Sequence, residues 1–272
     1  THFKKLVKNF KTIEDSDYEL PRTLKPVMRK YQKHGYRWLR TLESSGFGGI
    51  LADDMGLGKT LQVIAVLLAA KNEGRLDCSD AEGQKQPALI VTPASLVYNW
   101  QEEFTRFAPE ISVGMVVGNQ IQRREILDRY QAWDVLLTSY DLLKRDIADY
   151  EGKQFSYQVI DEAQYIKNHS TAAAKSVKLI QSRVRYALTG TPIENRLSEL
   201  WSIFDYLMAG FLYGYETFKK ELEMPVVKNQ DEDASKRLKR MVSPFILRRL
   251  KGDVLKDLPE KMEETYYAKM NE

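Results

Sequence analysis

The sequence predicts an α/β fold in which a mostly parallel sheet is flanked by helices. Short runs of apolar and β-branched residues alternate with longer stretches of helical character, which is the order of elements in a sheet built from crossover connections. Several of these runs show little alternation between polar and apolar residues. That pattern is expected for strands that are covered on both faces, as in parallel sheets.

The expected elements follow one another between residues 47 and 189. The expected strands are 47–52, 89–92, 113–117, 135–138, 157–160 and 186–189. The expected helices are 60–72, 95–107, 120–130, 140–149 and 171–181. Trp100 and Phe104 lie four residues apart on one of these helices and are expected to be core residues. The polar stretch 73–86 is expected to be an exposed loop.

After about residue 195 the strand signals stop. The expected helices in this part are 197–208, 216–223, 234–241 and 244–255. A polar segment that contains Pro225, residues 224–233, is expected to break the helical pattern. The sequence therefore predicts a C-terminal helical appendage on the α/β lobe.

Composition sets limits on the class of protein. The chain has 272 residues, of which 43% are hydrophobic and 29% charged, as in ordinary globular proteins. Lys and Arg total 41 against 38 for Asp and Glu, a balance that neither requires nor excludes nucleic acid. The single cysteine, Cys78, excludes an internal disulfide and suits a reducing compartment. The longest apolar run, 61–70, is too short to span a bilayer.

A glycine-rich run, DDMGLGKT, lies between an expected strand and an expected helix, which is the context of a phosphate-binding loop. Gly56 and Gly58 allow a tight turn that points backbone amides at phosphate oxygens. Lys59 is expected to place its charge between the β- and γ-phosphates, and Thr60 to offer its hydroxyl to Mg²⁺. The residues expected to bind the nucleotide here are Asp54, Met55, Gly56, Leu57, Gly58, Lys59 and Thr60.

The run departs from the general phosphate-loop pattern at its first position. That pattern has Gly five positions before Gly58, where this chain has Asp53. A glycine-rich turn that merely caps a core helix is the alternative interpretation. The strand–loop–helix context favours phosphate binding.

An acidic pair, Asp161 and Glu162, follows the expected strand 157–160. Ligands collect at the carboxyl ends of strands in open α/β sheets. Asp161 is expected to hold Mg²⁺, and Glu162 to orient or deprotonate an attacking water. An acidic pair can instead cap the following helix, but its combination with the phosphate loop favours catalysis.

A series of sequence blocks resembles the SWI/SNF-type ATPases of helicase superfamily two. The blocks are LADDMGLGKTLQ, IVTPASLVYNWQEEF, LLTSYDLL, VIDEAQYIKN, ALTGTPIEN, LSELWSIFDYL and FILRRLKGDVLKDLPEK. They occur in the family's order and cover the chain from about Leu24 to Lys261. The last block is typical of this branch and not of helicases in general.

The resemblance implies a RecA-like P-loop lobe, the first of two lobes that bind ATP and DNA across a cleft. It implies ATP and Mg²⁺ as cofactors, and an ATPase that translocates on double-stranded DNA and remodels protein–DNA complexes. A second lobe of the same parent chain would supply an arginine to the site, and no such block follows here. Arg248 and Arg249 lie in the family's connector region and are not assigned that role. The lobe alone is therefore expected to bind ATP but to hydrolyse it poorly.

Two groups of residues acquire roles through the resemblance. The family's adenine-reading glutamine matches Gln32, whose amide can both donate a hydrogen bond and accept one. The family's loops that contact the DNA backbone match Thr92 and Ser95 after one strand, and Ser139 and Tyr140 after another. Capping of the following helices by Ser95 and Ser139 is compatible with this role.

The family segment that couples nucleotide state to DNA state matches Thr189, Gly190 and Thr191. Many relatives have His at the position of Gln164. The Gln164 amide can still bridge to a threonine hydroxyl, although it does not titrate. We therefore expect Gln164 to connect the acidic block to the threonine segment.

The resemblance and the element order divide the chain into segments. Residues 1–23 are an N-terminal flank, 24–195 the ATP-binding lobe, 196–258 a helical protrusion and connector, and 259–272 a linker towards a second lobe. Expected partners are double-stranded DNA, that second lobe and a nucleoprotein, with no membrane. The expected location is the bacterial cytoplasm near the nucleoid rather than the nucleus, with no secretion. The alternative function is a nucleotide-regulated DNA- or protein-binding module without motor activity.

Overall fold

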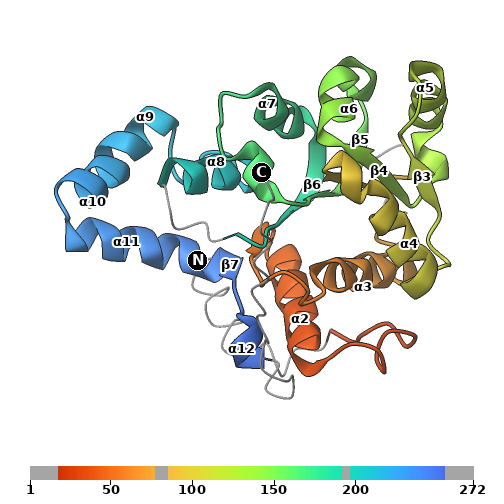
Figure 1. Cartoon of the computed structure of the whole chain (residues 1–272), viewed down its shortest axis with the longest axis horizontal. Helices are drawn as coiled ribbons and strands as arrows, with labels where there is room; N and C mark the ends of the chain where they lie inside the picture. The colour runs from red at the N-terminus through yellow and green to blue at the C-terminus, as the bar shows by residue number, and fades with distance from the viewer. Residues whose placement is uncertain (1–17, 77–84, 192–196, 255–272) are drawn as a thin grey trace, which may run out of the picture.

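The computed structural model describes residues 18–76, 85–191 and 197–254, and its sheet confirms the expected fold class. The sheet has seven strands in the order β3-β4-β2-β5-β6-β1-β7, and every neighbouring pair is parallel (Figure 1). The strands are β1 (Gly49–Leu51), β2 (Ala88–Thr92), β3 (Val113–Met115), β4 (Val135–Ser139), β5 (Gln154–Ile160), β6 (Gln181–Leu188) and β7 (Ile246–Leu247).

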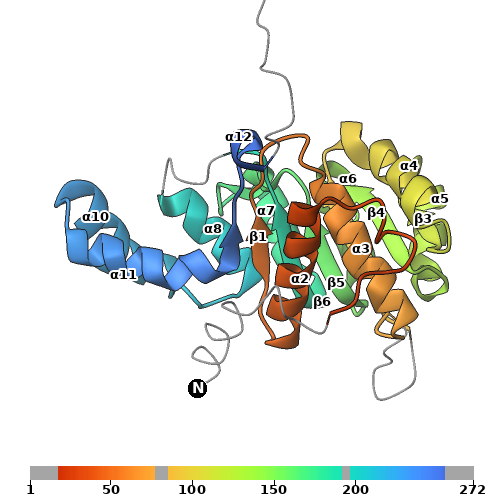
Figure 2. The same cartoon turned by 90° about the horizontal axis from the view of Figure 1, so that it is seen from below.

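Helices cover both faces of this sheet, as right-handed crossover connections require (Figures 1 and 2). One layer consists of α2 (Lys30–Ser44), α3 (Lys59–Asn72) and α4 (Val97–Phe107). The other consists of α5 (Gln120–Asp128), α6 (Tyr140–Arg145), α7 (Ala172–Leu179) and α8 (Leu197–Leu207). All residues of β2 and β4 are buried, which explains why their sequences are apolar without alternation.

The central helix α3 is covered on all sides. Every residue from Leu61 to Ala70 is buried, and the helix packs between α2 and α4. An all-round apolar sequence is what such a position requires. Since α3 begins at Lys59, this packing fixes the helix end that faces the glycine-rich loop.

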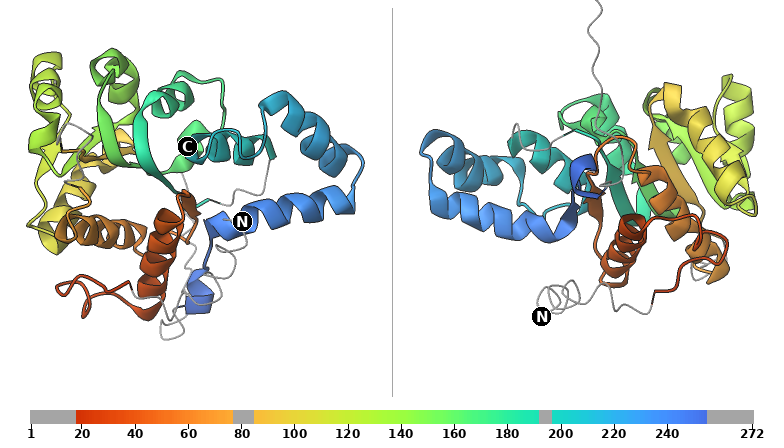
Figure 3. Two further views of the ribbon diagram at one scale, coloured as in Figure 1. Left: turned by 180° about the vertical axis from the view of Figure 1, so that it is seen from behind. Right: turned by 60° about the horizontal axis from the view of Figure 1, so that its bottom comes forward.

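Beyond α8 the chain forms a protrusion that stands at the opposite end of the molecule from α5 (Figures 1 and 3). It consists of α9 (Tyr215–Phe218), a π-helical turn (Lys219–Glu223), α10 (Met224–Lys228) and α11 (Glu232–Val242). The helical appendage that the sequence predicts is therefore present. Its first helix, α8, belongs to the layer on the sheet, because it packs against β6 and α7.

The expected helix over residues 244–255 is wrong. After a single turn at Ser243–Phe245 the chain forms β7, and the short helix α12 begins only at Lys251. In β7, Ile246 pairs with Ile50 of β1, so the chain returns from the protrusion to the sheet. Phe245 secures this return, because its buried ring lies 5.2 Å from the ring of Phe47.

Other boundaries differ in smaller ways. The expected break at residues 224–233 is wrong in its first part, because α10 includes Pro225 in its first turn, where the missing N–H is tolerated. The expected helix 140–149 is interrupted at Asp146, between α6 and a 3₁₀ turn, η4 (Ile147–Tyr150). The strands β5 and β6 begin earlier than expected, at exposed polar residues.

Parts of the predicted organisation lie outside the described residues. These are residues 1–17 of the N-terminal flank, the loop segment 77–84 with Cys78, residues 192–196, and residues 255–272, which include the end of the predicted segment 196–258 and the predicted linker 259–272. Within the described ranges, no helix combines the length and apolar character that crossing a membrane requires.

Candidate nucleotide-binding site

The glycine-rich loop joins the carboxyl end of β1 to the first residue of α3. Gly56 and Gly58 adopt φ values of +83° and +70°, a left-handed conformation that glycine tolerates best. A Cβ atom on Gly58 would lie 2.4 Å from Nε2 of Gln32, so a side chain at this position would displace the Gln32 amide from its contact with the loop. The amino terminus of α3 faces the loop, which provides backbone N–H groups for an anion.

Lys59 folds back onto the loop that precedes it. Its Nζ donates to the carbonyl of Asp53 at 2.7 Å and to that of Asp54 at 3.3 Å. Burial lowers the pKa of the ammonium group, and the nearby carboxylates of Asp161 and Asp53 oppose this shift. The partly buried charge therefore has partners in the loop that an incoming phosphate can replace.

Asp161 lies directly beyond β5 and uses both carboxylate oxygens. Oδ1 accepts from the backbone N–H of Glu162 at 2.8 Å, and Oδ2 accepts from the indole Nε1 of Trp100 at 2.9 Å. Burial raises the pKa of the Asp161 carboxyl, while both hydrogen bonds lower it. Trp100 is a buried core residue as expected, but the prediction missed its contact with the acidic block.

These side chains meet at one cleft of about 320 Å³, within the usual size range of ligand pockets. Lys59, Thr60, Asp161 and Glu162 all line it, so the predicted juxtaposition of the lysine and the acidic pair is present. The full lining is Met55, Gly56, Gly58, Lys59, Thr60, Leu96, Asn99, Trp100, Glu103, Asp161 and Glu162.

One wall of the cleft was not anticipated from the sequence. Leu96, Asn99, Trp100 and Glu103 contribute to it, and they lie three, four and seven residues apart at the start of α4. That spacing places side chains on one helix face. This helical spacing is visible in the sequence. It would have indicated these residues if the helix face that carries Trp100 had been assigned to the site as well as to the core.

The donor set of the cleft fits a magnesium–triphosphate group. Thr60 and Asp161 both line the cleft, and they offer hydroxyl and carboxylate oxygens, the ligands that Mg²⁺ prefers. Mg²⁺ in phosphate-transfer sites is held by one or two such protein groups together with phosphate oxygens and water. Lys59 and the glycine amides supply complementary charge and donors for the phosphates.

A chain of hydrogen bonds joins Glu162 to the threonine segment. The Gln164 amide donates to Oε2 of Glu162 at 2.7 Å, and its oxygen accepts from the hydroxyl of Thr189 at 3.2 Å. The Thr189 and Thr191 hydroxyls lie 3.0 Å apart. The bridge that we expected from Gln164 to a threonine hydroxyl is therefore formed.

The backbone has two unusual features next to this series of hydrogen bonds. Glu162 has a φ of +50°, which is uncommon for a residue with a side chain and is found at functional sites. A Cβ atom on Gly190 would lie 2.7 Å from the Met55 side chain and 3.6 Å from Nζ of Lys59. The threonine segment thus packs directly against the glycine-rich loop.

Gln32 supports the loop from the side of α2. Its Nε2 donates to the carbonyl of Leu57 at 3.1 Å, and its Oε1 accepts from the backbone N–H of Arg29 at 2.8 Å. Each amide atom keeps further hydrogen-bonding capacity. The contact with adenine stays a prediction.

The residues expected to contact DNA differ in accessibility. Ser95 is exposed, whereas the side chains of Thr92, Ser139 and Tyr140 are buried. The Ser139 hydroxyl accepts from the N–H of Leu142, and the Tyr140 hydroxyl donates to the carbonyl of Asp161 at 2.7 Å. Contact of these four residues with a DNA phosphate stays a prediction. Of their side chains, only that of Ser95 is accessible to a phosphate without rearrangement.

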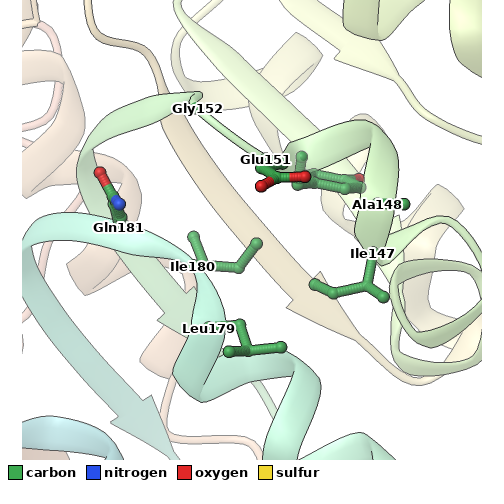
Figure 4. Close-up of a pocket in the computed structure, with 8 residues that line it drawn as sticks. Ile147, Ala148, Glu151, Gly152, Leu179, Ile180 and Gln181 are labelled. Atoms are coloured by element: carbon green, nitrogen blue, oxygen red, sulfur yellow. The ribbon is translucent and has the colours of Figure 1, made fainter.

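A second hollow, of about 300 Å³, lies between the η4 turn and the junction of α7 with β6 (Figure 4). Ile147, Leu179 and Ile180 line it, and Glu151 is the one charged residue of its lining. These segments precede β5 and β6, so the hollow lies at the amino ends of the strands. An anionic ligand would meet a carboxylate there, which makes this hollow unsuitable for a nucleotide.

Comparison with known proteins assigns the family. The model of the family described as "SNF2-related domain" matches residues 31–272. The chain belongs to this family. SNF2-related relatives include an uncharacterized ATP-dependent helicase of Mycoplasma genitalium, 42% identical over 90% of this chain. Another is the TATA-binding protein-associated factor MOT1 of Saccharomyces cerevisiae, 37% identical over 94% of this chain.

Solved structures of SNF2-type cores share the fold. The SWI2/SNF2 ATPase core of Sulfolobus solfataricus in complex with dsDNA is 43% identical, with a TM-score of 0.76, and covers 85% of this chain. A second structure, of the Sulfolobus solfataricus SWI2/SNF2 ATPase core domain, is 41% identical, with a TM-score of 0.73, and covers 90% of this chain. The chain spans 46% and 47% of those two chains. It spans only 22% and 14% of the Mycoplasma and yeast relatives.

Proposed function

We propose that this chain is the ATP-binding lobe of a DNA-dependent ATPase that translocates on double-stranded DNA and remodels protein–DNA complexes. The observation that carries the proposal is the convergence of Lys59, Thr60, Asp161 and Glu162 on one cleft at the carboxyl end of the sheet. Similarity to an ATPase core solved with dsDNA supports the DNA partner. Similarity to a TATA-binding protein-associated factor supports a nucleoprotein partner.

Each residue of the cleft has a distinct task in this proposal. Lys59 exchanges the Asp53 and Asp54 carbonyls for the β- and γ-phosphates, and the loop amides bind the same oxygens. Thr60 and Asp161 hold Mg²⁺, which supplies charge neutralisation on the phosphates when bound. Glu162 orients the attacking water and accepts its proton, while the hydrogen bond from Gln164 fixes the position of the carboxylate.

The lobe alone should hydrolyse ATP slowly. In the SNF2-type arrangement an arginine from a second lobe stabilises the charge that develops during phosphoryl transfer. Arg249 does not fill that role here, because its guanidinium is engaged with Asp53. Absence of such an arginine typically lowers the rate by about 10³-fold or more.

ATP turnover tests the proposal. We expect the chain alone to bind ATP with Mg²⁺ but to turn it over slowly, and fusion to a second RecA-like lobe to give turnover that duplex DNA stimulates. In the fused protein, Lys59→Ala and Glu162→Gln should fold but lose about 10²-fold or more of this turnover. DNA binding should weaken steeply with salt, because it depends on phosphate contacts.

Two outcomes would contradict this function. Turnover that ignores duplex DNA, together with nucleotide-dependent binding of DNA or protein, would favour a nucleotide-regulated binding module without motor activity. Lack of ATP binding by a folded chain would remove the basis of both interpretations.

A further inference from the structure

From the end of β7 the chain runs alongside the glycine-rich loop and is hydrogen-bonded to it at alternate residues. The N–H of Ala52 donates to the carbonyl of Leu247 at 2.7 Å, and the N–H of Asp54 donates to that of Arg249 at 3.0 Å. The N–H of Lys251 then donates to the Asp54 carboxylate at 3.0 Å. Residues 247–251 thus extend the sheet beside the loop. They are one part of the family's connector region, and from here on the word connector means these five residues.

Below this contact lies a buried ion pair. The Asp53 side chain has no solvent exposure, and that of Arg249 is 11% exposed. Nε of Arg249 donates to Oδ1 of Asp53 at 2.9 Å, and Nη2 donates to Oδ2. This two-point geometry is the strongest arrangement of an arginine with a carboxylate.

The pair is satisfied on its remaining sides. Arg249 also donates to the Gln62 amide oxygen at 2.7 Å and to the carbonyl of Tyr31, and its guanidinium lies 5.2 Å from the centre of the Tyr31 ring. A Cβ atom on Gly35 would lie 1.8 Å from the Gln62 oxygen. The cluster therefore fills the space between α2, α3 and the loop.

This cluster accommodates the departure of the loop from the general pattern at its first position. A carboxylate with no solvent exposure is tolerated only when a charge and hydrogen bonds compensate it. Arg249 provides both for Asp53. The loop thus depends on a residue 196 positions later in the chain.

Asp53 connects this cluster to the lysine of the site. Its carboxylate binds Arg249, while its carbonyl accepts from Nζ of Lys59 at 2.7 Å. When Lys59 moves to a phosphate, the carbonyls of Asp53 and Asp54 lose their shared partner. The loop backbone must then adjust between the nucleotide and the connector.

We propose that the Asp53–Arg249 ion pair couples nucleotide binding at the loop to docking of the connector on the sheet. The proposal rests on the proposed function in one respect, namely that the loop binds ATP. Because coupling between two sites is reciprocal, a connector that strengthens ATP binding is itself held more firmly when ATP is bound. Arg249 is in this sense a positioning residue, which acts through Asp53.

ATP affinity is the first readout. We expect Arg249→Gln and Asp53→Asn each to weaken binding of ATP with Mg²⁺ by about tenfold, within the usual range of coupling between sites. The double variant should lose no more than either single variant, because both remove the same interaction. Arg249→Lys keeps the charge but not the two-point geometry, so it should lie between these variants and the unaltered chain.

The matched control is a second buried ion pair outside the cleft. Arg123 binds Asp146 with both side chains 3% exposed, and Nη2 lies 2.7 Å from Oδ1. Arg123→Gln should lower the unfolding temperature as Arg249→Gln does, because removing one partner of a buried pair leaves the other charge uncompensated. It should nevertheless leave ATP affinity within about twofold. If Arg249→Gln does not fold, the comparison of Arg249→Lys with Arg123→Lys replaces it.

Hydrogen exchange is the second readout, because a merely structural role would leave it unmoved. ATP with Mg²⁺ should slow exchange at the amides of Ala52, Asp54 and Lys251 in the unaltered chain. This protection should disappear in Arg249→Gln, be reduced in Arg249→Lys and persist in the Arg123 variants. Since Lys251 lies outside the loop, its response reports on the connector itself.

The outcomes separate the two ideas. If the unaltered, folded chain binds no ATP, the proposed function fails. If it binds ATP, but the Arg249 variants bind it as the Arg123 variants do, the coupling is refuted. Unchanged exchange at Lys251 on ATP binding refutes it equally.

Discussion

At the scale of single residues, the presentation of Asp161 depends on one indole N–H. Trp100 donates to Oδ2 of Asp161 at 2.9 Å from a fully packed position on α4. The Glu162 N–H holds the other oxygen. With both oxygens restrained, the carboxylate keeps one orientation towards the cleft, where we expect Mg²⁺ to be bound.

Replacing Trp100 by Phe should therefore affect magnesium more than folding. The variant keeps an aromatic ring and loses the donor, and a hydrogen bond to a charged group contributes about 1.5–3 kcal/mol. We expect ATP binding to require roughly 10- to 150-fold more Mg²⁺, in proportion to that loss. A titration of ATP binding against Mg²⁺ concentration measures this requirement.

The same variant should shift the pH dependence of binding in a defined direction. Burial raises the pKa of Asp161, and the Trp100 hydrogen bond lowers it. Removing the donor favours the protonated carboxyl, so Mg²⁺-dependent binding should fail at a higher pH on the acid side. Trp133→Phe is the control, because the Trp133 N–H is buried without a hydrogen-bond partner among the described residues. Equal effects of the two substitutions would contradict this role of Trp100.

At the scale of elements, the sequence predicts best where an element has a uniform environment. β2 and β4 are buried throughout, so their apolar runs indicate strands directly. β6 was placed only at its buried end, because its first residues, such as Gln181 and Arg183, are exposed. The loop and the acidic pair were found because their spacing to strand ends is local information. The threonine segment was found only through the family resemblance.

Elements that exist only through tertiary contact were not predictable in this way. β7 has two residues, too few to display a period, and its pairing partner β1 lies far away in the sequence. The Asp53–Arg249 pair has the same origin, since nothing near either residue indicates the other. The departure from the glycine pattern at Asp53 was the one signal that a compensating cation was needed.

We expect the Phe245 side chain to stabilise the pairing of β7 with the sheet. Its ring is fully buried and lies 5.1 Å from that of Phe211 and 5.2 Å from that of Phe47. Replacing a buried Phe by Ala typically costs about 3–5 kcal/mol. We expect Phe245→Ala to lower the free energy of unfolding by this amount and to weaken ATP binding, because β7 leads into the connector.

The measurement is unfolding by urea, followed by ATP affinity at a concentration of urea where both proteins are folded. Leu250→Ala is the control, since that side chain is 44% exposed and its removal should change stability by less than about 0.5 kcal/mol. If Phe245→Ala is clearly destabilised but binds ATP with unchanged affinity, β7 has no influence on the nucleotide site.

At the scale of the whole molecule, the path of the chain brings the protrusion back to the nucleotide site. The chain leaves the sheet after β6, passes through α8 and the protrusion, and returns as β7 beside β1 (Figures 1 and 2). Both ends of the protrusion are thereby attached to the lobe. The glycine-rich loop receives contacts from the first, middle and last described parts of the chain, through Gln32, Gly190 and Arg249.

A ligand bound at such a junction should stabilise the whole lobe. Binding at about 100 times the dissociation constant adds roughly 2.7 kcal/mol to the native state, which for a domain of this size corresponds to about 5–10 °C in unfolding temperature. We expect ATP with Mg²⁺ to give a shift of this size in a thermal scan. Chelation of Mg²⁺ should remove most of it, because Lys59 then faces the phosphate charge without the metal. A shift of equal size in Lys59→Ala would mean that ATP binds elsewhere, since that variant lacks the cation that the loop presents to the phosphates.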